Sequence, residues 1–260
     1  MGFLSVLSMA HKLIVERVSP GDTVVDATCG NGVDTRFLAE LVGARGTVYA
    51  FDIQAQALQR TSERLAPLAA AGKLPLLHLV QDSHAAMAAY VAMPPQGVMA
   101  AMVAPPAASG SRLMGPRLVG PAGAEAARLA ESLAAESLSW AAAGDVAAAN
   151  GSRAEYAAAQ HSSKAAAVMF NLGYLPGADA DPAVITKTDS TLAALDAALT
   201  LLRPGGIITI VVYPGHVGGE LEAASVENWA SALPQLTAQA VLYRMAQKPD
   251  SPYLIAVEKK

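Results

Sequence analysis

The sequence predicts an α/β fold: a seven-stranded sheet, mostly parallel, with an antiparallel C-terminal hairpin and helices on both faces. Three observations support this prediction. Short apolar runs of strand length alternate with helical stretches, turns that contain glycine follow several of these runs, and the last two runs are joined by a very short connection. Continuous apolar strands are typical of a parallel sheet whose two faces are both covered by helices.

The first part of the chain contains three strand-and-helix units after an N-terminal helix. Leu4, Leu7, Ile14 and Val18 recur at helical spacing, so we expect this first helix to be amphipathic and to pack on the sheet. The expected strands are residues 23–27, 47–51 and 74–80, with helices through 37–41 and 55–70. This alternation favours parallel strands, because each crossover helix returns the chain to the starting edge of the sheet.

The pattern resumes in the C-terminal part of the chain. The expected strands are residues 165–170, 207–212, 238–244 and 253–258, with helices at 190–202 and 221–233. A turn is expected at 203–206, where the sequence is Arg-Pro-Gly-Gly. The turn-forming residues 248–252 leave no room for a crossover helix between the last two strands, so this pair is expected to be antiparallel.

An alanine-rich insertion at about 104–163 interrupts an otherwise single domain that spans residues 1–260. Similar apolar runs flank it at 98–103 and 165–170. We assign the second run to the fourth strand, because it delivers Asn171 to the edge of the sheet where ligands bind in such folds. Inside the insertion, one face of an expected helix carries Ala126, Leu129, Leu133 and Trp140. We interpret the insertion as a peripheral helix on connectors, with a lid or an RNA contact as the alternative.

The composition limits the classes of partner. The net charge is −4 and the sequence pI is about 5.7, whereas a protein that binds long nucleic acid through its phosphates is usually basic. A short RNA element or a small molecule stays compatible with this charge. Lys12, Glu16 and Arg17 interrupt the apolar N-terminus, so we expect a soluble, cytoplasmic protein without membrane contact. With Cys29 as the only cysteine and no ligand spacing among the five histidines, we expect no disulfide and no metal site.

The first candidate site is the turn after the first strand, which contains Gly30 and Gly32. Glycines let a ligand approach the backbone closely, and nucleotide-type ligands bind at the carboxyl ends of parallel strands. A dinucleotide fingerprint would have a third glycine where this chain has Thr35, which favours an adenosine ligand without a pyrophosphate. Asp52 ends the second strand, where a carboxylate can accept hydrogens from both ribose hydroxyls; a helix N-cap is the alternative.

Polar residues also follow three further strands. Ser83 and His84 come after the third strand, where we expect them to contact adenine. The alternatives are that Ser83 caps a helix and that His84 lies at the surface. Asn171 and Tyr174 belong to a string that resembles the Asn-Pro-Pro-Tyr turn of amino-group methyltransferases. In that turn the asparagine oxygen accepts hydrogens from the target nitrogen, and the aromatic ring packs on a flat base. His216 follows the fifth strand and is a candidate proton relay, with a structural role as the alternative.

Together these stretches resemble a bacterial family of rRNA-methylase-like proteins, whose characterised members are tRNA 5-(aminomethyl)-2-thiouridine methyltransferases. The likeness lies in Asp-Ala-Thr-x-Gly-Asn-Gly-x-Asp-Thr at 26–35, Tyr-Ala-Phe-Asp-Ile-Gln at 49–54, Ser-His at 83–84, Asn-Leu-Gly-Tyr-Leu-Pro-Gly at 171–177 and Val-Val-Tyr-x-Gly-His at 211–216. It covers nearly all of residues 1–97 and 165–260. The family consists of class I S-adenosylmethionine-dependent methyltransferases, whose Rossmann-like sheet has seven strands and ends in an antiparallel pair.

The resemblance implies methylation of the exocyclic amine of 5-aminomethyl-2-thiouridine at the tRNA wobble position, giving 5-methylaminomethyl-2-thiouridine. The anticodon stem-loop is then the expected contact. The implied cofactor is S-adenosylmethionine, and the residues that would hold it are Gly30, Asn31, Gly32, Asp34, Asp52, Gln54, Ser83 and His84. Asn171, Tyr174 and His216 would serve the reaction. The chain departs from the family at Cys29, at Pro214 and in the alanine-rich insertion.

Other functions are compatible with parts of the sequence. The chain could methylate an rRNA base or a small molecule, or it could be a non-catalytic domain that binds S-adenosylmethionine or RNA. Intact Gly30, Gly32, Asp52 and Asn171 disfavour the non-catalytic alternative. An NAD-dependent oxidoreductase is disfavoured by Thr35 and by the closing hairpin. The oligomeric state is left open, with a homodimer as one option.

Overall fold

The computed structural model describes residues 2–91, 164–173, 186–215, 218–248 and 250–260, all of which belong to one compact unit. The alanine-rich insertion expected at about 104–163 lies outside the described residues, as do Tyr174 and His216. The described residues include the glycine turn after the first strand, Asp52 and Asn171.

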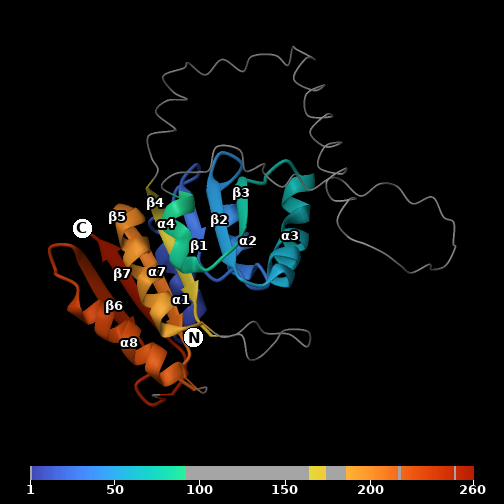
Figure 1. The fold of residues 1–260 in the computed structure, drawn as a ribbon. Coiled ribbons are helices and arrows are strands. Elements are labelled where there is room, and N and C mark those ends of the chain that lie inside the picture. Colours follow the sequence, from blue (N-terminus) through green and yellow to red (C-terminus); the bar gives the residue numbers. More distant parts are fainter. Residues whose placement is uncertain (1, 92–163, 174–185, 216–217, 249) are drawn as a thin grey trace, which may run out of the picture. The chain divides into compact units, whose positions relative to one another are not determined.

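Within the described residues, seven strands form a sheet in the order β3-β2-β1-β4-β5-β7-β6 (Figure 1). Their bounds are β1 Thr23–Asp26, β2 Thr47–Asp52, β3 Leu76–Gln81, β4 Ala165–Asn171, β5 Leu202–Val212, β6 Ala238–Tyr243 and β7 Tyr253–Lys259. Strands β1 to β5 are parallel to one another, whereas β7 is antiparallel to both β5 and β6. The expected mostly parallel sheet with an antiparallel C-terminal hairpin is therefore confirmed.

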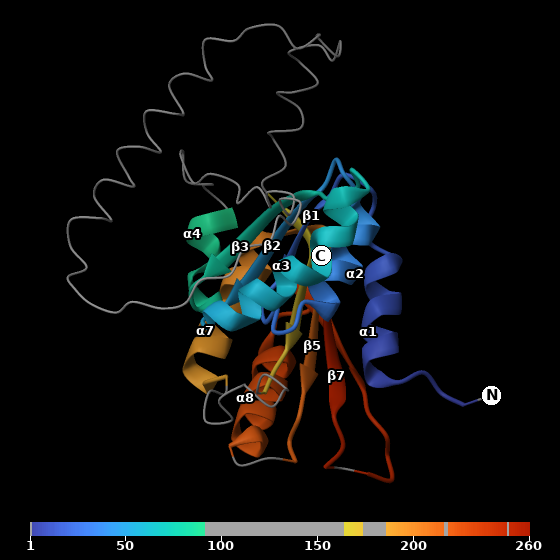
Figure 2. The same ribbon diagram turned by 90° about the vertical axis from the view of Figure 1, so that its right-hand side faces the viewer.

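Helices cover both faces of this sheet. Their bounds are α1 Val6–Val15, α2 Val33–Val42, α3 Ala55–Ala70, the 3-10 helix η1 His84–Ala86, α4 Met87–Val91, α7 Thr188–Leu201 and α8 Gly219–Ala232. Helices α1, α2 and α3 pack on one face, and α4, α7 and α8 pack on the other (Figure 2). The prediction of helices on both faces is confirmed.

Alternate side chains along the central strands enter the two opposite cores. Val24 of β1 packs with α1, α2 and α3, whereas the next residue, Val25, packs with the helices of the other face. In β5, Val211 packs on the same face as Val24, and Ile210 packs on the same face as Val25. Burying one such aliphatic side chain contributes roughly 1.5–3 kcal/mol to folding. A shift of strand register by one residue would exchange the two sets of side chains, so both cores fix the register.

The structure corrects the expected turn at 203–206. Strand β5 begins at Leu202 and includes these residues, and its pairing with β4 is irregular there. Gly205 takes up the irregularity with a φ of 72°. The guanidinium of Arg203 donates to both carboxylate oxygens of Asp22 at 2.9 Å, a bidentate geometry that is specific to arginine. This ion pair ties the start of β5 to the turn before β1, and no local sequence signal predicts it.

The apolar stripe expected on the first helix is only partly buried. Ile14 and Val18 are in the core, whereas Leu4 and Leu7 are 44% and 39% exposed. Leu4 precedes the helix, whose N-cap is Ser5, so its side chain does not follow the helical periodicity. The expectation that all four residues pack on the sheet is therefore wrong for the two leucines.

We expect the unit formed by the sheet to fold without the alanine-rich insertion. Removing residues 104–163 and joining the chain through a short glycine–serine linker keeps all seven strands and both cores. Thermal unfolding followed by circular dichroism should then remain a single cooperative transition. Loss of that transition would show that the insertion supplies part of the core.

Candidate active site

The carboxyl ends of β1, β2, β3 and β4 surround a cavity of about 540 Å³. The start of α7 and the residue after β5 complete its wall. In the sheet order, β1 lies between β2 and β4: the chain adds β2 and β3 on one side of β1 and then crosses back to add β4 and β5 on the other side. Ligands of open α/β sheets bind in the crevice that such a reversal creates. The cavity therefore lies where the fold predicts a nucleotide-type site.

Most of the residues singled out from the sequence meet in this cavity. Those that line it are Gly30, Asn31, Asp34, Asp52, Gln54, Ser83, His84 and Asn171. Gly32 is not among the lining residues, and Tyr174 and His216 lie outside the described part of the chain. The strand ends thus bring together side chains from four separate stretches of sequence.

The carboxylate of Asp52 is held by backbone donors at the end of β2. Its Oδ2 accepts the N–H of Gly30 at 3.1 Å, and its Oδ1 accepts the N–H of Gln54 at 2.9 Å. Burial raises the pKa of this carboxyl group, and the backbone donors oppose that rise. A carboxylate has about four acceptor positions. The backbone N–H of Ile53 also holds this carboxylate, and the acceptor capacity that is left suits a hydroxyl of a ribose.

Gly32 shapes the glycine turn from outside the cavity wall. It has a φ of 74° at the N-cap of α2, and a Cβ built there would lie 2.8 Å from the Cα of Thr61 on α3. Helix α3 also holds the turn through two arginines. Arg60 donates to the side-chain oxygen of Asn31 at 3.2 Å, and Arg64 donates to the backbone oxygen of Asn31 at 2.6 Å. The close approach of α3 is thus the reason for glycine at position 32.

At the ends of β2 and β3, the cavity is lined by the apolar side chain of Ile53 and by the polar residues Asp82 and Ser83. Ile53 is 56% exposed although it lines the cavity, and such a side chain can cover one face of a flat ring. Asp82 accepts the N–H of Ser83 at 2.7 Å and the hydroxyl of Tyr90 at 2.9 Å. The hydroxyl of Ser83 accepts the N–H of Ala85 at 3.3 Å, so Ser83 also caps η1. This part of the cavity suits an aromatic base with polar edges.

His84 is buried, so its interpretation as a surface residue is wrong. Its ring lies edge-on to Phe170, with the ring centroids 5.9 Å apart. Burial lowers the pKa of His84, and backbone groups of Ala27 and Ser190 near the ring oppose this fall. Among the described residues its Nε2 has no hydrogen-bond partner. A buried polar atom without a partner at a cavity wall is a candidate ligand contact.

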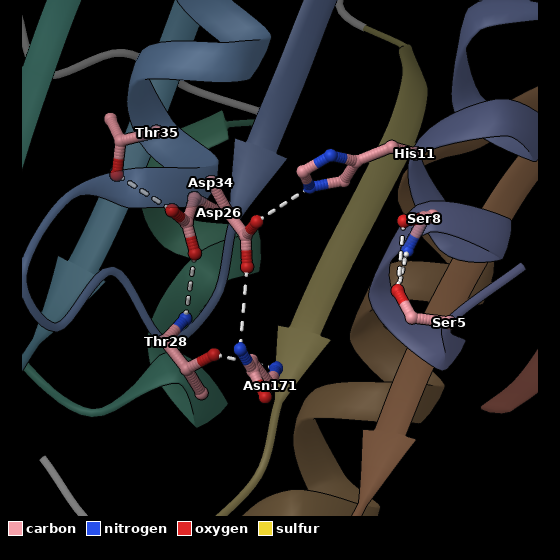
Figure 3. Close-up of polar contacts among 8 residues, drawn as sticks. All are labelled: Ser5, Ser8, His11, Asp26, Thr28, Asp34, Thr35 and Asn171. Carbon is pink, nitrogen blue, oxygen red and sulfur yellow. Dashed lines mark hydrogen bonds and ion pairs between the residues drawn. The ribbon is translucent and has the colours of Figure 1, made fainter. Parts of the chain in front are cut away.

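Asn171, at the end of β4, is held by the turn after β1 and by α2 (Figure 3). Its backbone N–H donates to the Oγ1 of Thr28 at 2.7 Å, and its Nδ2 donates to the Oδ2 of Asp34 at 3.4 Å. The amide oxygen of Asn171 is then the acceptor that a ligand in the cavity can use. The Oδ1 of Asp34 forms a further hydrogen bond of 2.7 Å with the Nε2 of His11 on α1.

A second carboxyl group, that of Asp26, lies next to this network. Asp26 is 1% exposed, and it accepts the hydroxyl of Thr35 at 2.6 Å and the N–H of Thr28 at 3.2 Å (Figure 3). Burial, followed by repulsion from Asp34, raises the pKa of Asp26 to about 7. Asp26 is therefore largely protonated in mildly acidic solution, where it adds little negative charge to the site.

Sequence reasoning missed several residues around the cavity. Thr186 pairs with Gly173 in both directions: its Oγ1 accepts the N–H of Gly173 at 3.1 Å, and its own N–H donates to the Gly173 oxygen at 3.0 Å. Thr186 also donates to the buried carboxylate of Glu222 on α8 at 2.7 Å. Thr28 and His11 were missed as well. No local pattern marks these side chains, because their partners are distant in sequence; Thr186 and Glu222 are 36 positions apart.

Comparison with known proteins assigns the chain to a family. A family model described as "Putative rRNA methylase" matches residues 48–103 and 128–258, and a methyltransferase-domain model matches residues 18–72. The chain belongs to the rRNA methylase family. The tRNA (mnm(5)s(2)U34)-methyltransferase, chloroplastic, of Arabidopsis thaliana is 30% identical over 257 residues, which cover 97% of this chain and 68% of that protein.

Solved structures agree with this assignment. A structure from Clostridium thermocellum with the same rRNA-methylase description has a TM-score of 0.67 and 28% identity, over 100% of both chains. A "putative methyltransferase" from Streptococcus mutans, solved in complex with SAH, has a TM-score of 0.63 and 25% identity, again over 100% of both chains. The chain is a class I methyltransferase that uses S-adenosylmethionine.

The residues of this methyltransferase fit that cofactor. The carboxylate of Asp52 at the cavity wall suits a ribose hydroxyl, and the exposed Ile53 suits the face of adenine. Gly30, with a φ of 51°, leaves the backbone open beside the cavity. In the described part of the chain, no helix is long and apolar enough to cross a membrane. The same residues contain no group of three or more His, Cys, Asp or Glu side chains that could hold a metal ion.

Replacing Asp52 tests the ribose assignment. We expect Asp52→Ala to weaken S-adenosylmethionine binding by about 1.5–3 kcal/mol, the usual contribution of hydrogen bonds to a charged group. Asp52→Asn should lose less, because it keeps one acceptor oxygen. Calorimetric titration measures both affinities, and Glu40→Ala, a surface change on α2, is the control. An unaltered affinity in Asp52→Ala would rule out the ribose contact.

The raised pKa of Asp26 predicts a specific pH dependence of stability. Between about pH 4 and about pH 7 the folded state binds this proton more tightly than the unfolded state, so the free energy of unfolding falls as pH rises. Asp26→Asn removes this contribution. The variant should therefore become more stable relative to the parent as pH rises, by up to about 1.4 kcal/mol per pH unit. Urea unfolding at several pH values measures the difference, and a constant difference across this range would contradict the assignment.

Proposed function

We propose that this methyltransferase methylates the aminomethyl nitrogen of 5-aminomethyl-2-thiouridine at the wobble position of tRNA, giving 5-methylaminomethyl-2-thiouridine. The observation that carries the proposal is the position of Asn171. Its amide oxygen belongs to a residue that lines the cavity, while its amide nitrogen is engaged by Asp34. The name of the Arabidopsis relative, a tRNA (mnm(5)s(2)U34)-methyltransferase, supports the same substrate.

We assign the cofactor to the part of the cavity formed by β1, β2 and β3. Asp52 would accept the ribose hydroxyls, with Gln54 beside it, and Ser83 and His84 would contact adenine. Gly30 would lie next to the methionine part of the cofactor. S-adenosylmethionine supplies a methyl group bonded to a positively charged sulfur, so the methyl carbon is the electrophile.

The remaining part of the cavity would orient the target amine. Its lone pair must lie in line with the bond from the methyl carbon to sulfur, and such orientation contributes much of an enzyme's rate enhancement. Asn171 would accept an N–H of the target nitrogen and so fix the direction of the lone pair. Tyr174 would pack on the thiouracil ring, and His216 would relay a proton, as the sequence predicts for both.

The proposed partner is tRNA, contacted through its anticodon stem-loop. A net charge of −4 fits a short RNA element better than a long duplex. Lys187 is an exposed cation on the cavity wall and is suited to a nearby phosphate.

We propose one catalytic domain, with the alanine-rich insertion at about 104–163 as an addition to it. The cytoplasmic location stays a prediction.

Asn171→Ala tests the mechanism directly. We expect turnover to fall by roughly 10²-fold or more, because the target nitrogen loses its orientation. The affinity for S-adenosylmethionine should remain unchanged. The assay is methyl transfer from labelled S-adenosylmethionine to tRNA that carries 5-aminomethyl-2-thiouridine, with calorimetry for the cofactor.

Two controls accompany this measurement. Asn228→Ala removes an exposed asparagine from α8 and should leave turnover unchanged. Unmodified tRNA should accept no methyl group. Equal labelling of modified and unmodified tRNA would refute the proposed substrate, and full turnover of Asn171→Ala would refute the role of that residue.

A further inference from the structure

Asp34 is a carboxylate at the cavity wall with both oxygens fixed. Its Oδ1 lies 2.7 Å from the Nε2 of His11, and its Oδ2 accepts the Nδ2 hydrogen of Asn171 at 3.4 Å (Figure 3). An ionised carboxylate only accepts hydrogens, so the Nε2 of His11 carries the hydrogen of that contact. The three side chains come from α1, α2 and β4, and they meet next to the amide oxygen proposed to orient the substrate.

Within the described residues, Asp34 is not paired with a permanent cation. Asp34 is 8% exposed, and among the described residues it forms no ion pair with a lysine or an arginine. Buried charges are usually paired, because their removal from water is costly. A buried carboxylate that an imidazole and an amide hold in place is therefore complementary to a cationic group of a ligand.

We propose that Asp34, in place of His216, accepts the proton that the target amine must lose before methyl transfer, an inference that rests on the proposed function. An aliphatic amine reaches the site mostly as an ammonium ion, which would donate one N–H to Asp34 and another to the amide oxygen of Asn171. Transfer of a proton to Asp34 leaves a neutral amine. The lone pair of its nitrogen then forms the bond to the methyl carbon, while the bond from that carbon to sulfur breaks and leaves its electron pair on sulfur. The product is a secondary ammonium ion, and Asp34 returns its proton to water when the product leaves.

The neighbouring Asp26 is unsuited to this task. It is not among the cavity-lining residues, and its oxygens are engaged by Thr28 and Thr35 in the core. Among the described residues, the titratable groups that interact with Asp34 are His11 on α1 and Asp26 on β1. The third neighbour, Asn171 on β4, has no charge. Asp34 is thus the acidic side chain of the network that faces the cavity.

The proposal narrows the class of substrate. The exocyclic amino groups of adenine and cytosine are neutral, so they have no ionic attraction to a carboxylate and need not lose a proton before they react. An aliphatic ammonium carries such a proton and is attracted by the negative charge. Asp34 therefore selects a base that bears an aminoalkyl group.

His11 is a positioning residue for Asp34. Its ring stacks on Phe37 with 3.9 Å between the ring centroids and 7° between the ring planes. This stacking fixes the direction in which Nε2 donates to Asp34. The N-terminal helix is thereby connected to the reacting group, although His11 itself is not among the residues that line the cavity.

The first test is the pH dependence of turnover in Asp34→Asn. At neutral pH we expect turnover to fall by about 10²–10⁴-fold, the usual contribution of a general base. The deficit should shrink as pH rises, because the amine then loses its proton to solvent before it binds. The family resemblance places Asp34 among the cofactor residues, whereas the present proposal assigns its carboxylate to the amine, so SAH affinity should stay unchanged. A deficit that is the same at every pH, or a large loss of SAH affinity, would show that Asp34 serves the fold or the cofactor instead.

Variants of His11 test the network without altering the carboxylate. His11→Ala should lower turnover at constant SAH affinity, and His11→Gln should restore part of the loss, because its amide can donate to Asp34. Lys12→Gln, an exposed change on the same helix, is the matched control. Equal turnover in His11→Ala and the parent would remove His11 from the mechanism. These variants also provide the test if Asp34→Asn does not fold.

A binding measurement separates this inference from the proposed function. In the presence of SAH, the parent should bind an anticodon stem-loop with the aminomethyl group roughly 10- to 100-fold more tightly than one without it, as expected for a charged hydrogen bond. Asp34→Asn should bind the two RNAs equally. If the parent does not methylate the modified tRNA, the proposed function fails. If it does, and Asp34→Asn keeps both the turnover and the RNA preference, only the role of Asp34 fails.

Discussion

The parallel pairing of β1 with β4 is the constraint on which the site depends. It aligns Val24 with Ala167 and Asp26 with Met169, so both strands end at the same edge of the sheet. The hydrogen bond of 2.7 Å from Asn171 to Thr28 then joins residues that are 143 positions apart. The glycine turn, which would hold the cofactor, and Asn171, which would orient the substrate, share a cavity because of this register.

Asp26 and Asp34, the acidic residues near the contact between Asn171 and Thr28, lower the stability of the fold. Asp26 sits in the core with a raised pKa, and Asp34 is nearly buried beside it. Burial and repulsion from Asp34 raise the pKa of Asp26, so ionisation of Asp26 destabilises the folded state. A core built for stability alone would replace them with apolar side chains. The position of Asp34 at the cavity wall, with Asp26 behind it, agrees with a site that needs one negative charge next to a buried hydrogen-bonding network.

The shape of the glycine turn comes from tertiary contacts as much as from its own sequence. Helix α3 approaches Gly32 so closely that a Cβ would overlap with Thr61, and two arginines of the same helix hold Asn31. At the end of β2, backbone donors fix the carboxylate of Asp52. A cavity held from several directions needs little rearrangement when a ligand binds, and such preorganisation lowers the cost of binding.

The sequence by itself determined the alternation of strands and helices, the antiparallel hairpin and the glycine turn, because these features follow from periodicity and turn chemistry within short windows. It also identified Asp52 and Asn171, which end strands and therefore meet at one edge of any parallel sheet. The irregular start of β5 and the pairing of Arg203 with Asp22 were not predicted, because each joins residues that are far apart in the chain. Only the tertiary structure placed His11 against Asp34 and Glu222 against Thr186, since each contact joins elements whose packing no local pattern encodes.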